Sequence, residues 1–577
     1  MAAGARAQSE PASPAAAAPP HPPASSEQPE QSEQSEQSEP GAGELRDAET
    51  LLELDEMGGD DADRQPNTDG PPRGERSFRF GLSSTLGVTA TGGAPQTDLR
   101  LDDDGSYLRG QLLAPSRSQL YPSVSLSFDA EWEAASWLLL HTLLDTQEIR
   151  EGDTLVPPLP GITMGGQPVE DAVREGDYIR ELSATGTFSA FSLEVGRFRA
   201  RIADGLVHDG FASGLRARVD LGEVGSTDLR FELLLGSAGP RIDKIEANTL
   251  GALSADLNVT PFESVGLFIA TSRDRSGELS SVLRSALAEG IATGERADAL
   301  SGDLSADEAL LVDSALTSVL YPCIFVSASP TEPMAADGSA VLNCDGTPGS
   351  EGEIAYLGGR FHVLPADGLS VRGTLVLAGG EFALGIARTQ PDPEMTDAVA
   401  RDVEFEVAGW AGDVEAHYGI HDDLDLGVYA FLLSGDDPPR GDDDRYRAFI
   451  GLAPYWVWTS VFFSGWINQG LQPSRASAAG INGRGAAGIG TGMEYTRGEG
   501  TAELRVFWLR ALSPPPVTDH AGDGLGYGLE VDLQLRHRVA DALALGVEGG
   551  VLFPGDFFAQ RDVAYRTLGT LTVHYAD

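Results

Sequence analysis

Lysine, cysteine and long apolar runs are scarce in this chain of 577 residues. Lys244 is the only lysine, and 88 acidic residues against 40 basic ones give a formal net charge of −48. A chain this acidic repels phosphates, which argues against a nucleic-acid partner. The longest strongly apolar stretch lies around Trp137–Leu140, and no run reaches the length of a transmembrane helix. A transmembrane β-barrel is not excluded, because its signal is weak in each segment.

The two cysteines, Cys323 and Cys344, flank a loop rich in proline, alanine and glycine. A pair at this spacing predicts a disulfide in an oxidising compartment, and the alternative is two free buried thiols. The chain has no CxxC motif, histidine cluster or phosphate-binding glycine loop, and the aspartate runs 102–104 and 442–444 lack the pattern of a calcium loop. We therefore expect no metal and no cofactor.

Catalytic signatures are equally thin. Gly210–Gly214 places its serine wrongly for the Gly-x-Ser-x-Gly motif of hydrolases. His208 and Asp209 could pair for general-base chemistry, but we expect them at the polar tip of a turn. The sequence therefore predicts that the protein is not an enzyme.

Residues 1–76 have the composition of a disordered, acidic and proline-rich periplasmic tail, with Glu-Gln-Ser repeats between Glu30 and Glu39. Ala5–Ala7 has the form of a signal-peptidase site, which is either a signal-peptide remnant or a chance match. Apolar residues within 44–57 share one helical face and predict a short helix, either a docking peptide or a transient structure.

From Phe78 onward the apolar residues recur with a period of two, in runs separated by loops rich in glycine, aspartate and proline. We expect about 18 to 22 strands of about ten residues, which is the length of a tilted bilayer crossing and exceeds that of ordinary soluble strands. No alternation of strands with helices appears, so a parallel α/β fold is excluded. Residues 77–577 are thus predicted to form an all-β, transmembrane antiparallel barrel of about 18 strands.

Residues 191–221 show this pattern most clearly. Strand 191–197 and strand 214–221, joined by a polar turn, each alternate apolar side chains with charged or very small ones. In a soluble sandwich the apolar face would be the core, whereas in a membrane barrel it would face lipid.

Charged residues recur at the middle of strands on the non-apolar face, and in a barrel they would line a water-filled lumen. They are Glu131, Glu133, Arg216, Arg218, Glu404, Glu406, Arg505, Glu530, Asp532 and Arg536. We expect Arg197, Arg216, Arg218 and Arg505 to face acids across water and to act as a selectivity filter; the alternative is that they form ion pairs between strands.

Aromatic residues gather in 455–458 and 462–466, where we expect girdles at the membrane interface; the alternative is a packed aromatic cluster. Residues 275–352 differ from the rest, because their leucines have helical spacing. This helix-bearing insertion is expected either to constrict the barrel mouth or to cap its surface.

Two stretches contain motifs in addition to the general alternation of strands. Residues 193–214 contain Gly196-Arg197 followed by Asp204-Gly205-Leu206. Residues 526–533 contain Gly-x-Glu-x-Asp-Leu, and residues 551–558 contain Phe-Pro-Gly-Asp-Phe, close to the motif Phe-x-Pro-Gly-Asp-Phe. Both resemble the alginate-export family of outer-membrane barrels. The resemblance implies a monomeric barrel that passes a polyanionic polysaccharide or a smaller solute, with Arg197, Arg199, Glu530 and Asp532 in the lumen. The family's pore is strongly electropositive, whereas this chain is acidic.

Three functions fit these observations. The first is a channel in the outer membrane of a Gram-negative bacterium, in contact with lipid and lipopolysaccharide, passing a polar or charged solute. The second is a non-conducting barrel that anchors or scaffolds, and the third is a secreted soluble β protein. We favour the channel, with selectivity residues Glu194, Arg197, Arg199, Arg216, Arg218, Arg505, Glu530 and Asp532.

Overall fold

The structure is a computed structural model, and its described residues all belong to one compact unit, Met57–Asp577. They are residues 77–93, 119–145, 149–150, 163–164, 167–168, 179–224, 227–238, 248–260, 262–274, 279, 282–283, 351–388, 399–421, 423–437, 445–452, 454, 459–463, 476–515, 524–558 and 561–576. The expected tail 1–76 with its helix, the pair Cys323 and Cys344, and most of the insertion 275–352 lie outside these residues.

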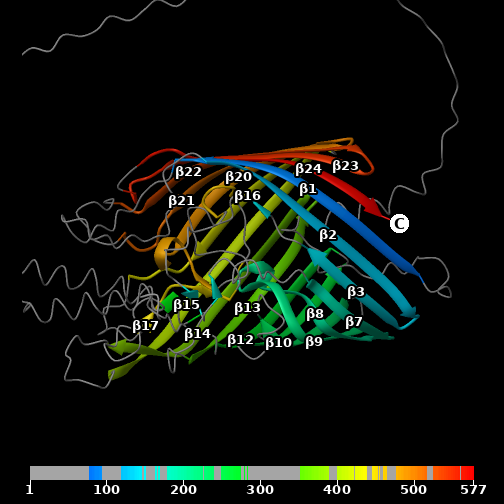
Figure 1. The fold of residues 1–577 in the computed structure, drawn as a ribbon, viewed down its shortest axis with the longest axis horizontal. Helices are drawn as coiled ribbons and strands as arrows, with labels where there is room; N and C mark the ends of the chain where they lie inside the picture. The colour runs from blue at the N-terminus through cyan, green and yellow to red at the C-terminus, as the bar shows by residue number, and fades with distance from the viewer. Residues whose placement is uncertain are drawn as a thin grey trace, which may run out of the picture. The chain divides into compact units, whose positions relative to one another are not determined.

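Eighteen of the described strands pair into one ring, in which every neighbouring pair is antiparallel (Figure 1). The expected antiparallel β-barrel of about 18 strands is confirmed. The strands are β1 (Phe78–Gly92), β2 (Gln119–Ala135), β3 (Leu138–Asp145), β7 (Ile179–Phe188), β8 (Phe191–Ile202), β9 (His208–Val224), β10 (Thr227–Ala238), β11 (Asn248–Thr260), β12 (Glu263–Asp274), β13 (Glu351–Ala366), β14 (Leu369–Arg388), β15 (Val399–His421), β16 (Leu424–Leu433), β20 (Ala486–Arg497), β21 (Gly500–Arg510), β22 (Gly526–Ala540), β23 (Leu543–Pro554) and β24 (Ala564–Ala576).

The ring closes between its first and last strands, where β1 pairs with β24 from Gly81 opposite Ala576 to Gly92 opposite Tyr565. Short pieces lie outside this ring. They are β4 (Ile149–Arg150), β5 (Thr163–Met164), β6 (Gln167–Pro168), β17 (Arg445–Tyr446), β18 (Ile450–Gly451) and β19 (Ser477–Ala478), with the 3-10 turns η2 (Ala203–Gly205) and η6 (Ile481–Gly483). Of these, β17 pairs in parallel with β15, beyond the reach of β16.

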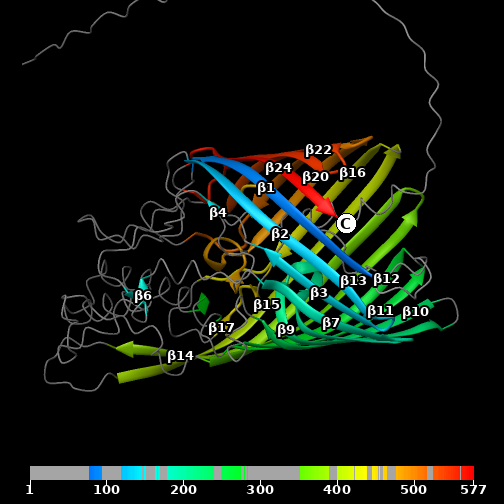
Figure 2. The same cartoon turned by 45° about the vertical axis from the view of Figure 1, so that its right-hand side comes forward.

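The two ends of the barrel differ. At one end, eight connections between the described strands are two residues long, as in 367–368 and 498–499. Gly368 and Gly498 have φ values of 73° and 60°, which glycine adopts without steric penalty in tight hairpin turns. The connections at the opposite end are longer, and there the hairpin of β14 and β15 extends beyond its neighbours (Figure 2). We call these the turn end and the loop end.

Alternation along each strand separates two faces. On β22, Leu529, Leu533 and Leu535 point out of the ring and are 42%, 45% and 41% exposed, whereas Glu530 and Asp532 point inward and are buried. The same division holds on β12, where Val265, Leu267 and Ile269 are exposed and the residues between them are buried. The barrel therefore has an apolar outside, the reverse of a soluble β-sandwich.

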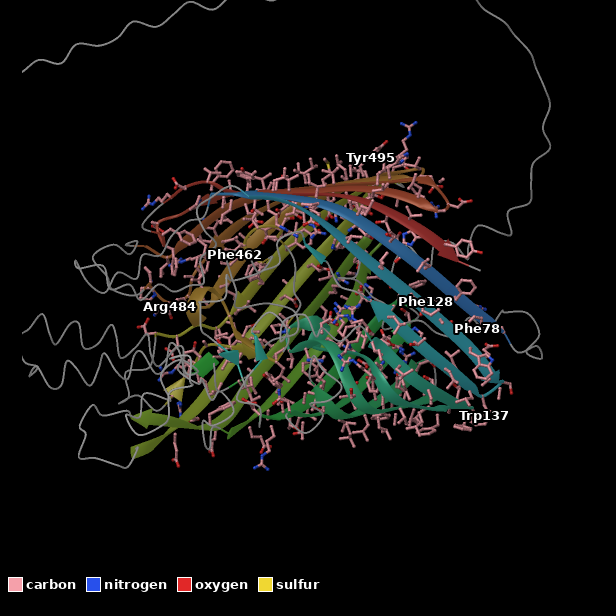
Figure 3. The ribbon with its side chains drawn as sticks, in the orientation of Figure 1. Phe78, Phe128, Trp137, Phe462, Arg484 and Tyr495 are labelled. Carbon is pink, nitrogen blue, oxygen red and sulfur yellow. The ribbon has the colours of Figure 1, made fainter. Side chains whose placement is uncertain are left out.

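Exposed aromatic side chains form a belt around the turn end, where Figure 3 shows Phe78 and Trp137. A smaller group of exposed aromatic residues lies nearer the loop end. The first belt comprises Phe78, Trp132, Trp137, Phe188, Phe191, Phe262, Tyr418, Tyr495 and Tyr575, and the second comprises Trp410, Trp508, Phe553 and Tyr565.

The sequence placed an interfacial girdle elsewhere, and for the described part of that segment this was wrong. Phe462 and Phe463 are fully buried and pack edge to face with centroids 4.9 Å apart, inside the barrel. Residues 455–458 lie outside the described part. Two adjacent aromatic residues in a loop that folds inward bury their apolar surface in the barrel interior. The periodicity of the sequence does not show that the loop folds inward. No helix among the described residues is long and apolar enough to cross a membrane.

Candidate functional site

The tip of the hairpin between β8 and β9 lies inside the barrel. We call residues 197–213 the inner hairpin. Its tip residues Leu206 and Val207 are buried, and η2 contacts β13 and β14, although three strands separate β9 from β13 around the ring. The hairpin therefore crosses the interior rather than continuing the wall.

Two glycines let the hairpin leave the wall. Gly196 has a φ of 133°, and a Cβ there would collide with the carbonyl oxygen of Leu182. A Cβ on Gly214, which lies opposite Gly196 on β9, would collide with the carbonyl oxygen of Leu235. Glycine permits the positive φ at position 196 and the close approach of a neighbouring strand at both positions, so the pair sets the bend.

The inner hairpin keeps its two faces beyond the bend. Phe198, Ala200, Ile202 and Ala212 on one face are buried in the interior hydrophobic cluster. The other face carries arginines: Arg199 Nε donates to Asp209 Oδ1 at 2.9 Å, and Arg201 lies 3.8 Å from the second oxygen of the same carboxylate. Arg197 is also on this face, buried beside Phe211, with its Nε donating to the carbonyl of Arg180 at 3.1 Å.

These positions differ from the turn that the sequence predicted. The strands extend to Ile202 and begin again at His208, and the connection of residues 203–207 is buried except for Asp204, rather than a polar tip. His208 and Asp209, expected at that tip, lie in β9 and are 2% and 6% exposed. The wrong expectation has a physical cause: a strand that bends inward keeps the period of two, and the local sign of the bend is a change of phase at Gly196, from apolar residues at odd positions to apolar residues at even positions.

A second element fills the interior from the opposite side. The described residues of the connection 434–485 between β16 and β20, which we call the inner loop, contact the inner face of β22. The backbone N–H groups of Val461 and Phe462 donate to Glu530 at 2.6 and 3.0 Å, and that of Ser460 donates to Asp532 Oδ1 at 3.1 Å. Successive N–H groups directed at carboxylates form an anion nest, which anchors the loop.

The C-terminal end of the inner loop is fastened to the same strand. Tyr527 O–H donates to the carbonyl of Gly485 at 2.8 Å and its oxygen accepts the N–H of Ile481 at 3.2 Å. The ring of Tyr527 packs 4.6 Å from Phe462 and from Phe557, centroid to centroid. Hydrogen bonds and aromatic packing thus hold the middle and the C-terminal end of the inner loop against β22.

The two inner elements meet. Leu452 N–H of the inner loop donates to the carbonyl of Val207 at the hairpin tip, at 2.8 Å. Next to it, the carbonyl of Ile450 accepts the hydroxyl of Tyr356 from β13 at 2.8 Å. A continuous hydrogen-bonded path therefore runs from β8 and β9 through both elements to β13. Figure 3 labels Phe462 and Arg484 of the inner loop.

Ion pairs line the remaining inner wall. Arg216 Nε lies 3.5 Å from Glu194 Oε2 on β8, and Arg218 Nε donates to Glu232 Oε2 on β10 at 2.7 Å. Arg505 contacts Glu503 on its own strand. The sequence placed these arginines opposite acids across water, whereas their carboxylate partners are in direct contact. The first two contacts join neighbouring strands and the third joins two residues of one strand, so the inner wall is polar and its charges are paired.

The strongest of these wall contacts spans a strand. Arg360 on β13 donates from Nε and Nη2 to both oxygens of Asp256 on β11, at 2.9 and 2.7 Å. The strand between them contributes Gly266, where a Cβ would collide with Asp256 Oδ1. A bidentate, charge-assisted pair is among the firmest side-chain contacts, and here it depends on a glycine beneath it.

The expected selectivity residues therefore separate into three settings. Glu194, Arg216, Arg218 and Arg505 belong to the paired wall, Glu530 and Asp532 anchor the inner loop, and Arg197 and Arg199 lie on the inner hairpin.

Comparisons with known proteins give similarities of fold alone. No family model matches the chain, and no curated protein matches it. The solved structures that it resembles include OccK11 (OpdR) of Pseudomonas aeruginosa, with a TM-score of 0.39 and 12% identity over 87% of this chain and 96% of that one. OpdO of Pseudomonas aeruginosa gives 0.42 and 10% over 87% and 97%. The outer membrane protein OprD from Pseudomonas aeruginosa gives 0.39 and 9% over 87% and 93%.

At these scores the similarities carry no argument about function, and the resemblance to the alginate-export family stays a prediction. The barrel itself rests on the strand pairing described above. Residues that sequence reasoning missed are Asp204, Tyr356 and Arg360, which join elements far apart in the chain. Each sits in an ordinary alternating strand or a short Asp-Gly turn, so no local signal distinguishes it. No group of metal-ligating side chains appears among the described residues.

Proposed function

We propose that this protein is a channel of the outer membrane of a Gram-negative bacterium and that it passes a small polar or charged solute. The observation that carries the proposal is the combination of an apolar outer face with a charged, ion-paired inner face on the same strands. A barrel built this way is matched to hydrocarbon outside and to water inside.

The spacing of the aromatic belts supports a membrane position. On β24, Tyr565 and Tyr575 both point outward and lie ten residues apart. At roughly 3.3 Å per residue and a tilt of about 40°, ten residues rise about 25 Å, which is the height of the apolar band of outer-membrane barrels. Outer-membrane barrels have short periplasmic turns and longer extracellular loops, so the turn end would face the periplasm and the loop end the cell exterior.

The inner hairpin and the inner loop would set the size of what passes. Both cross the interior and are joined through Val207 and Leu452. We therefore favour a small solute over the polysaccharide that the alginate-export resemblance implies, because a polymer would require both elements to move. The arginines of the inner hairpin face and the paired wall would contact such a solute along its path.

One observation favours the second candidate, a non-conducting barrel. The interior cluster includes fully buried residues from both inner elements and from the wall, among them Val207, Phe462 and Tyr356. A packed interior of this kind resembles a plug, and a plugged barrel would serve as an anchor or scaffold.

Planar-bilayer recording of the refolded, full-length protein separates the two. We expect discrete conductance steps from a protein whose gel mobility is heat-modifiable, and a reversal potential in a salt gradient that reports its charge selectivity. Replacing residues 198–212 by Asn-Gly, a favoured two-residue hairpin turn between the paired Arg197 and Ser213, should enlarge those steps. Silence of the folded wild-type protein, with conduction only in the shortened variant, would instead favour the non-conducting barrel.

A further inference from the structure

The tip of the inner hairpin has an unusual backbone. Ala203, Asp204 and Gly205 have consecutive φ values of 57°, 50° and 89°. Glycine tolerates the left-handed region, but alanine and aspartate bring Cβ against the following carbonyl oxygen. Among the described residues, the remaining non-glycine with positive φ is Ser189, in a two-residue turn of the wall. Strain of this kind persists where surrounding contacts hold it, and it marks candidate switch regions.

Asp204 makes the side-chain contacts that join this tip to the wall strands β13 and β14. Its Oδ2 accepts the hydroxyl of Thr374 on β14 at 2.7 Å, and its Oδ1 lies 3.7 Å from Arg360 Nη1 on β13. Arg360 is already bidentate with Asp256, so Asp204 is a second, weaker partner, and Arg360 keeps a full carboxylate contact without it. Separating Asp204 from Arg360 therefore costs less free energy than separating an ion pair of the wall.

Exposure distinguishes this contact from the anchor of the inner loop. The side chains of Asp204 and Arg360 are 43% and 35% exposed, whereas Glu530, which anchors the loop, is 0% exposed. Water can therefore replace the partners of Asp204 as they separate, and no buried charge is left behind. The carboxylate that anchors the inner loop is buried, whereas the side-chain contact between the hairpin tip and the wall is partly exposed.

We propose that Asp204, Thr374 and Arg360 form a latch that holds a strained inner hairpin across the barrel, and that its release opens the path. The inference rests on the proposed function as a channel. Two opposing effects set the balance: the contacts of Asp204 favour the closed position, and the strain at Ala203 and Asp204 favours leaving it.

The opposition predicts substitutions with opposite effects. Asp204→Asn and Thr374→Val weaken the latch, and we expect each to raise the frequency of channel opening about threefold to tenfold, since the hydrogen bond is charge-assisted but its carboxylate is partly exposed whereas Thr374 is buried. Ala203→Gly keeps the latch and relieves the strain, so it should lower the opening frequency several-fold. Asp220→Asn, at the far end of β9, breaks the 2.8 Å pair with Arg230 and should leave gating unchanged.

Single-channel recording of these four variants tests the latch, with hydrogen exchange of a peptide covering 202–208 as a second measurement. Faster exchange in Asp204→Asn and slower exchange in Ala203→Gly, with Asp220→Asn like the wild type, is the expected result. Unchanged opening and unchanged exchange in the first three variants would overturn the latch. Folded protein that never conducts, yet shows the expected exchange differences, would retain the latched tip but overturn the channel and the gating role.

Discussion

The anchor of the inner loop on β22 gives the sharpest quantitative prediction. Glu530 is fully buried and accepts the N–H groups of Val461 and Phe462 with its two oxygens, at 2.6 and 3.0 Å. The substitution Glu530→Gln keeps the size and shape of the side chain but replaces one acceptor by an NH₂ group. One of the two backbone N–H groups then faces a donor and loses its partner.

The expected magnitude follows from that single orphaned group. A buried donor left without a partner costs about 1–3 kcal/mol, which corresponds to an increase of roughly 5- to 150-fold in the population of the undocked loop. The estimate does not depend on the charge of Glu530, because the geometry of the two acceptors is what changes.

Hydrogen exchange measured by mass spectrometry is the appropriate assay, because the amides of 460–462 are the donors in question. Under conditions where exchange reports the opening equilibrium, Glu530→Gln should accelerate exchange in the peptide containing 459–463 by the factor above. Glu232→Gln is the matched control, because it weakens an ion pair with Arg218 between β9 and β10, on another part of the wall than β22. Exchange within twofold of the wild type in Glu530→Gln would refute the anchoring role.

Three further predictions concern the barrel itself. Leu533→Arg places a charge in the middle of the apolar outer face and should destabilise the barrel in lipid by about 2–4 kcal/mol, whereas Gln534→Arg, on the inner face, should have little effect. Urea titration in lipid vesicles measures both free energies of unfolding. Equal effects of the two substitutions would contradict the assigned faces. Gly196→Val should cost at least about 2 kcal/mol through strain at a φ of 133° and collision with Leu182, visible as a lower temperature for the heat-induced gel shift. Arg360→Ala, which leaves the mostly buried Asp256 without its bidentate partner, should cost about 1–3 kcal/mol by the same assay, against less than about 1 kcal/mol for Asp220→Ala.

The ring of strands could be predicted from the sequence because alternation is a local signal. Leu529, Leu533 and Leu535 alternate with Glu530 and Asp532, and that pattern alone gives a strand with one apolar and one polar face. The direction in which the apolar face points came from strand length and from the number of charges opposite it. The structure bears out both the strand count and the outward apolar face.

The interior could not be predicted in the same way, because it depends on contacts between distant residues. In residues 191–202 the apolar positions change phase at Gly196, from 191, 193 and 195 to 198, 200 and 202, but each half still reads as an ordinary strand, so the period of two does not show that the hairpin turns into the interior. Phe462 and Phe463 look like interfacial residues until the loop that carries them is seen to fold inward. Asp204 meets Thr374 across 170 positions of sequence, a relation that neither periodicity nor motif spacing encodes.

The seam between β1 and β24 has a consequence for biogenesis. Residues at opposite extremes of the barrel sequence, such as Leu82 and Tyr575, are direct neighbours there. Closure must wait until the final strand has emerged, and until then a long hydrogen-bonding edge and an oily surface are both uncovered. A nascent chain with such a seam needs a chaperone on its way to the bilayer and a partner that pairs with its free edge strand. Deleting β24 should therefore produce aggregated protein rather than a smaller barrel.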